Sequence, residues 1–188
     1  VLATILITSF ISSSNMSMIN VALPVIGREL SMNAVLLGWV VTAHILSTAA
    51  FQVPIGKFAD IFGRKKVYLA GTIIFSGTTL LSGLSISGTM LISARGLAGI
   101  GAAMIITTGL AILTSVFPPQ ERAQAIAANI ASVYLGISLG PLIGGVLTGH
   151  LGWRSIFYIS SAVGIAAVIM VLLKLKGDWA EAGEESFD

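Results

Sequence analysis

The chain has 188 residues, of which 55% are hydrophobic and only 10% charged, and its mean hydropathy is +0.97. A soluble domain carries about 25% charged residues, and a chain this small has too much surface to hide so many apolar side chains from water. The composition therefore excludes an ordinary soluble domain and predicts a membrane protein. Its basic residues lie between apolar runs rather than in one patch, which is not the pattern of a nucleic-acid-binding protein.

Six apolar runs are long enough to cross a bilayer, since a spanning helix needs about 20 residues. They cover about 1–23, 34–55, 67–86, 89–113, 123–147 and 155–173. We expect Pro24 to end the first span, because a proline disfavours helix in the residue before it. Residues 24–33 are expected to form a loop, with a short interfacial helix within it as the alternative. The predicted fold is all-α, an integral membrane bundle of six transmembrane helices over residues 1–174. A cytoplasmic acidic linker or tail over residues 175–188 is predicted to follow it.

The positive charges around the spans predict the orientation of the chain. One alternate set of connections and ends holds seven of the ten Lys and Arg, namely Lys57, Arg64, Lys65, Lys66, Arg122, Lys174 and Lys176. The other set holds Arg28 and Arg154, with Arg95 just inside the fourth span. Because Lys and Arg favour the cytoplasmic side of a membrane, we expect both termini in the cytoplasm and the protein in the plasma membrane.

Residues that carry chemistry are scarce. The chain has no Cys and its two His are far apart in the sequence, so neither a metal site nor a cofactor is predicted. Residues 136–140 fit the pattern G-x-S-x-G, with His150 nearby, and could suggest an intramembrane serine hydrolase. That motif needs a strand-to-helix turn, whereas here it runs through the middle of a predicted helix, so no enzyme is expected.

The segment between the second and third predicted spans, residues 56–66, carries more than positive charge. A basic loop would explain its Lys and Arg, but not Asp60 at the membrane edge or the glycines around it. The segment resembles G-x-L-A-D-R-x-G-R-K, the signature of the major facilitator superfamily between these two helices. The matching residues are Gly56, Ala59, Asp60, Gly63, Arg64 and Lys65. Phe58 and Ile61 depart from the signature.

Arg95 lies inside the fourth predicted span, where a charge costs about 2.5–3.5 kcal/mol on insertion scales and is a functional candidate. Residues 95–103 are similar to the family's fourth-helix pattern R-x-x-Q-G-x-G-A-A, with Ala98 in place of the Gln. The alternative is that Arg95 lies near the outer end of its helix and extends its charged group to the interface.

Gly136, Gly140 and Gly144 recur every fourth residue in the fifth predicted span and so share one helix face. Small residues let helices approach closely in lipid, and Pro141 removes a backbone hydrogen bond and can bend the helix. Residues 136–145 resemble the fifth-helix signature found mainly in antiporters of the superfamily. A packing seam with a bend is the structural interpretation of the same residues.

Residues 15–24 resemble D-x-T-I-V-N-V-A-L-P, the first-helix motif of the drug–proton antiporter branch with fourteen helices. Asn20 to Pro24 match without a gap, but Asn15 stands in place of the Asp and Ser17 in place of the Thr. Asn15 cannot titrate, so no carboxylate remains inside any predicted span. Hydrogen bonding between helices is the alternative role for Asn15 and Asn20.

The resemblance covers nearly the whole chain and implies the N-terminal six-helix half of a transporter, built from two related three-helix units. A C-terminal half is expected in the same full-length chain, with the lipid bilayer, a small-molecule substrate and protons as the other partners. The implied function is proton-coupled efflux of small amphiphilic compounds, of the multidrug type, by alternating access.

The resemblance also assigns roles to residues. The conformational and coupling residues would be Gly56, Asp60, Gly63, Arg64, Arg95, Gly136, Gly140, Pro141 and Gly144. Asp60 and Arg64 would stabilise one access state through contacts with the other half, and Arg95 would tune protonation. The substrate cavity is predicted to be lined by Asn15, Asn20, His44 and Gln52.

Two other functions remain open. A facilitator without proton coupling is favoured by Asn15 and the absence of embedded acids, and a non-transporting fragment is favoured by the missing second half. His44 is the one embedded side chain that can titrate near neutrality, although a histidine in a helix more often serves as a hydrogen-bonding polar group.

Overall fold

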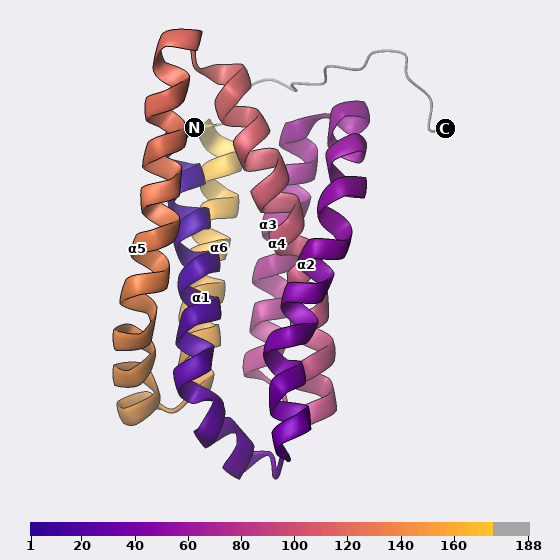
Figure 1. The fold of residues 1–188 in the computed structure, drawn as a ribbon, viewed down its shortest axis with the longest axis vertical. Coiled ribbons are helices and arrows are strands. Elements are labelled where there is room, and N and C mark those ends of the chain that lie inside the picture. Colours follow the sequence, from indigo (N-terminus) through magenta and orange to yellow (C-terminus); the bar gives the residue numbers. More distant parts are fainter. Residues whose placement is uncertain (175–188) are drawn as a thin grey trace.

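The computed structural model describes residues 1–174, which form a bundle of six α-helices (Figure 1). The helices are α1 (Leu2–Glu29), α2 (Ala34–Phe62), α3 (Arg64–Gly83), α4 (Gly88–Val116), α5 (Pro119–Leu151) and α6 (Arg154–Lys174). The α2–α3 and α4–α5 connections lie at the upper end of the bundle in Figure 1, and the other three lie at its lower end. The acidic linker or tail predicted over residues 175–188 lies outside the described residues.

Five of the six helices, all except α3, are long and apolar enough to cross a membrane. This confirms the predicted all-α membrane bundle and shows that its third helix is the most polar. The reason is its composition, since α3 begins with Arg64, Lys65 and Lys66 and continues with many hydroxyl residues. The hydroxyls of Thr72, Ser76 and Ser82 are satisfied within the helix, because each donates to the carbonyl four residues earlier.

The predicted end of the first span at Pro24 is wrong, because α1 continues to Glu29. A proline inside a helix removes one backbone hydrogen bond and brings its ring against the carbonyl four residues earlier, at a cost of about 3 kcal/mol. Ala22 and Ile26, on either side of it, are fully buried in an apolar cluster with Trp153, which directly precedes α6. Packing of this last part of α1 therefore outweighs the local preference of the proline.

The predicted loop over residues 56–66 is also wrong, because α2 runs to Phe62 and α3 begins at Arg64. Gly63 alone connects the two helices, and its φ of 98° lies in the left-handed region that favours glycine. The signature segment is thus a tight helical corner, in which the side chains before and after Gly63 have fixed positions.

The glycine face of α5 packs tightly against another helix, as predicted, and that helix is α1. A Cβ on Gly136, Gly140 or Gly144 would lie 2.6, 2.6 or 2.7 Å from atoms of α1. At such a close approach, polar groups bond across the seam: the Ser17 hydroxyl donates to the Ile137 carbonyl at 2.8 Å. The absence of side chains on this face is therefore what allows α1 and α5 to pack along their length.

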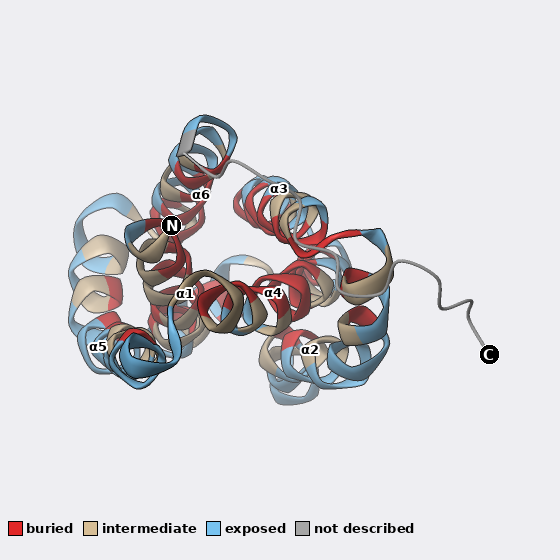
Figure 2. Ribbon diagram, turned by 90° about the horizontal axis from the view of Figure 1, so that it is seen from above, coloured by how far each residue is buried: buried red, intermediate tan, exposed pale blue. Residues whose placement is uncertain are grey.

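Two glycines of α4 have the same function on other sides of that helix. A Cβ on Gly99 would collide with the backbone of His44 on α2, and a Cβ on Gly101 would lie 2.6 Å from the Phe75 nitrogen on α3. The helix α4 is thereby held close to both α2 and α3. Viewed along the bundle, its buried residues face inward between α1, α2 and α3 (Figure 2).

Replacing Gly140 with Leu should destabilise the protein, because the new side chain enters the α1–α5 seam. Overpacking costs about 1–3 kcal/mol or more, so we expect Tm of the purified full-length chain to fall by about 5 °C or more. Gly149→Leu is the matched control on the same helix, since a Cβ there would meet nothing within 4 Å. Equal Tm values for the two variants would contradict a packed seam.

Candidate functional site

A buried arginine joins four helices in the middle of the bundle. Arg95 of α4 is only 1% exposed, and its Nη1 donates to Asn15 Oδ1 of α1 at 3.0 Å, while its Nε contacts the Val40 carbonyl of α2 at 3.5 Å. The amide of Asn15 in turn donates to the Ser160 hydroxyl of α6 at 2.9 Å. These residues and His44, whose contacts are described next, form what we call the Arg95 network: Arg95, Asn15, Val40, Ser160 and His44.

The interfacial alternative for Arg95 is excluded by its burial. No carboxylate in residues 1–174 bonds to its guanidinium, whose acceptors are a neutral amide and a backbone carbonyl. Asn15, which replaces the Asp of the family motif, is therefore a direct partner of Arg95. An Asp at this position would form an ion pair with the guanidinium.

His44 of α2 connects the Arg95 network to a cavity. It is buried, and its Nδ1 lies 3.3 Å from the Arg95 carbonyl. A carbonyl oxygen can only accept, so the hydrogen bond assigns the proton to Nδ1 and leaves Nε2 of the neutral ring as an acceptor. Thr48, one turn further along α2, donates to the carbonyls of His44 and Gly99 at 2.8 and 3.1 Å.

The cavity lies between α1, α2 and α4 and has a volume of about 320 Å³. It is lined by Ser12, Ser13, Met16, His44, Ile45, Thr48, Ala49, Gln52, Ala102 and Ile106. Two of the residues predicted to line a cavity, His44 and Gln52, do so. The other two are not among the lining residues of this cavity: Asn15 is buried against Arg95, and Asn20 is exposed elsewhere on α1.

Sequence reasoning missed most of the polar lining. His44, Thr48 and Gln52 are spaced four residues apart and so form one stripe along α2, a signal that could have identified Thr48. Ser12 and Ser13 had no such signal, because hydroxyl residues occur throughout these helices and serve mostly to bond their own backbone.

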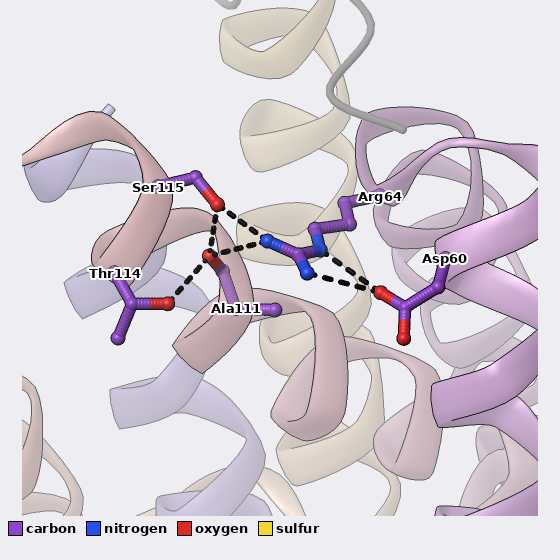
Figure 3. A network of polar contacts seen from close by, with 5 residues as sticks. All are labelled: Asp60, Arg64, Ala111, Thr114 and Ser115. Atoms are coloured by element: carbon purple, nitrogen blue, oxygen red, sulfur yellow. Dashed lines mark hydrogen bonds and ion pairs between the residues drawn. The ribbon is translucent and has the colours of Figure 1, made fainter. Parts of the chain in front are cut away.

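The signature residues Asp60 and Arg64 form a second polar site at the upper end of the bundle (Figure 3). Both Nε and Nη2 of Arg64 donate to Asp60 Oδ1, at 3.1 and 3.0 Å. The remaining Nη1 contacts the Ala111 carbonyl at 3.4 Å and the Ser115 hydroxyl, both near the end of α4. The ion pair therefore joins α2 to α3 at the corner, and Nη1 of Arg64 fastens this corner to α4.

Of the two glycines in this signature, only Gly63 has a backbone conformation that favours glycine. Gly63 has the positive φ described above, whereas a Cβ on Gly56 would make only an ordinary contact, 3.6 Å from Thr107. Arg64 is buried but the Asp60 side chain is 46% exposed. One carboxylate of the upper end thus remains accessible to a neighbouring group.

A third polar cluster ties the lower end of the bundle, and sequence reasoning assigned it no role. Glu29 at the end of α1 accepts from Trp153 Nε1 at 2.7 Å and forms an ion pair with Arg154. Arg154 also donates to the Ser85 carbonyl after α3 at 3.1 Å, and its guanidinium lies 4.3 Å from the centre of the Trp153 ring. This cluster connects the lower ends of α1, α3 and α6.

Comparisons with known proteins agree with this architecture. Residues 5–186 match the family model described as Major Facilitator Superfamily. The chain is 36% identical over 188 residues to the riboflavin transporter RibZ of Clostridioides difficile, covering all of this chain and 41% of that protein. It is 37% identical over 155 residues to the multidrug resistance protein Stp of Mycobacterium tuberculosis, covering 82% of this chain and 29% of that protein.

Among solved structures, a bacterial homologue of the human lysosomal transporter Spinster, in an inward-facing and unoccupied conformation, has the same fold. Its TM-score is 0.81 at 23% identity, over all of this chain and 45% of that one. The chain thus spans less than half the length of each of these proteins. The match of the family model over nearly the whole length establishes that the chain belongs to the Major Facilitator Superfamily, whose members are membrane transporters and not enzymes.

Proposed function

We propose that the chain forms the N-terminal half of a proton-coupled exporter of small amphiphilic compounds, which works by alternating access. The observation that carries the proposal is the cavity of about 320 Å³ between α1, α2 and α4. It combines apolar walls with a few polar groups, as small-molecule sites do, and it adjoins the buried Arg95 network.

The names of the relatives support the export of small molecules. They include a multidrug transporter, two antibiotic resistance or export proteins and a cephamycin export protein. The lengths of the relatives support a second half of similar size in the full-length chain, which would close the cavity from the opposite side. In this proposal the upper end of the bundle faces the cytoplasm, both termini of the chain are cytoplasmic, and the membrane is the plasma membrane.

The polar clusters at the two ends fit a half that moves as one body. In the proposal, the corner formed by Gly56, Asp60, Gly63 and Arg64 stabilises one access state through the exposed face of Asp60. The seam formed by Gly136, Gly140, Pro141 and Gly144 holds α5 to α1 during the motion. In the proposal, Arg95 shifts the pKa of the group that binds and releases the coupled proton.

A specific observation favours a facilitator without proton coupling as the second candidate. Asn15 takes the position beside Arg95 at 3.0 Å where the family motif has an acid, and an amide cannot release a proton. A proton-coupled mechanism must then use His44 or an acid outside the described residues.

Proteoliposomes that contain the full-length protein can separate these two functions. Uphill substrate export should stop when an ionophore collapses the proton gradient, and substrate should trigger proton release from the purified protein. Export that continues unchanged without the gradient would instead support the facilitator. Proton release that vanishes in His44→Gln assigns coupling to His44, and release that persists assigns it to an acid elsewhere in the full chain.

Asp60→Asn should lower the maximal transport rate while leaving substrate affinity nearly unchanged, because Asp60 lies at the upper end of the bundle and does not line the cavity. Weakening its charged hydrogen bonds to Arg64 should reduce the rate about threefold to tenfold, with KM within about twofold of the wild type. Glu121→Gln is the matched control, since Glu121 is an exposed acid at the start of α5. A rise in KM as large as the fall in rate would place Asp60 in the binding site.

A further inference from the structure

The cavity contains few hydrogen-bond donors. Three of its five polar side chains already use their protons within the chain. The single hydroxyl proton of Thr48 points to the His44 and Gly99 carbonyls, at 2.8 and 3.1 Å. The hydroxyl of Ser13 donates to the Ser9 carbonyl at 2.7 Å.

His44 adds a third acceptor. Its Nδ1 proton is engaged by the Arg95 carbonyl at 3.3 Å, so the neutral ring offers only the lone pair of Nε2. Since hydroxyl oxygens that donate still have lone pairs to accept with, Thr48, Ser13 and His44 all present acceptors. Gln52 and Ser12 are the remaining polar lining residues, and each can donate as well as accept.

The charges around the cavity also favour one class of ligand. None of the ten lining residues is acidic, so this wall has no countercharge for a cationic ligand. His44 bonds to the backbone carbonyl of Arg95, and the guanidinium of that residue, a cation, has an amide and a carbonyl as its acceptors rather than a carboxylate of residues 1–174. A bound cation would therefore be both unpaired and repelled, in a region where charges are poorly screened.

We propose that this cavity selects neutral amphiphiles through their hydroxyl or N–H groups, which donate to Thr48, Ser13 and Nε2 of His44, and that it disfavours permanent cations. The apolar part of such a ligand would lie against Met16, Ile45 and Ile106. This assignment of substrate class rests on the proposed function, but it concerns binding and can be measured without transport.

Three probes test it on the purified full-length protein, at mildly acid pH where phenols are protonated. They are the polyphenol quercetin, its fully O-methylated ether, and tetraphenylphosphonium. Quercetin should bind about tenfold or more tighter than the ether, since the ether retains the rings but has no donors. Tetraphenylphosphonium should bind weakest.

Thr48→Val removes one acceptor with little change in volume. It should weaken quercetin binding about threefold to tenfold and leave binding of the ether unchanged. Ser13→Ala should have the same selective effect and serves as the second variant if Thr48→Val does not fold. The control is Thr78→Val, because Thr78 makes the same type of bond, to the Ile74 carbonyl, on α3 outside the cavity.

The proposal is overturned if the ether binds as tightly as quercetin, if tetraphenylphosphonium binds most tightly, or if neither Thr48→Val nor Ser13→Ala changes the quercetin-to-ether ratio. Transport of the same probes in proteoliposomes is measured separately. Selective binding without transport would contradict the proposed function and leave the binding assignment intact.

Discussion

The arrangement of this half-bundle depends on keeping one positive charge buried between its helices, with no carboxylate from residues 1–174 bonded to it. Arg95 is 1% exposed, and the acceptors it has in residues 1–174 are an amide on α1 and a carbonyl on α2. Leaving such a charge unsatisfied would cost several kcal/mol. The acceptors must therefore come within hydrogen-bond distance, and this requires α1, α2 and α4 to pack closely around it. Glycines make that approach possible. Gly99 lets α4 pack against α2, and the glycine face of α5 packs against α1.

The same constraint shapes the cavity. Because the backbone of Arg95 engages Nδ1 of His44, the imidazole is fixed in the wall with one nitrogen left to accept. Thr48 is held in the same way by two carbonyls. The two ends of the bundle are fastened independently, by Asp60 and Arg64 at one end and by Glu29, Trp153 and Arg154 at the other. With both ends and the centre tied, the six helices are suited to move together against a partner half, as the proposed alternating access requires.

Much of this could be predicted from the sequence, and the exceptions have physical reasons. Long apolar runs fixed the number of helices, and the four-residue glycine repeat identified the α5 face, because both depend on local pattern alone. The predicted helix ends at Pro24 and Ile55 were wrong, since burial of Ala22 and Ile26 and a turn of one residue at Gly63 overrode local preference. The bond between Asn15 and Arg95, which lies 80 positions away in the sequence, was not predicted. A contact between residues of two different helices cannot be predicted from the residue pattern of either helix alone.

A double-mutant cycle on Asn15 and Arg95 tests the central claim most directly, with thermal unfolding of the full-length protein as the measurement. A hydrogen bond to a buried charge contributes about 1.5–3 kcal/mol, so Asn15→Leu should lower Tm by about 5 °C. Asn20→Leu, at an exposed position on the same helix, should change Tm by no more than about 1 °C. In the Arg95→Leu background, Asn15→Leu should cost little more, because the charge that needs the amide is gone. If Asn20→Leu costs as much as Asn15→Leu, or if the effects of Asn15→Leu and Arg95→Leu simply add, then Arg95 is not held by Asn15 and the account is wrong.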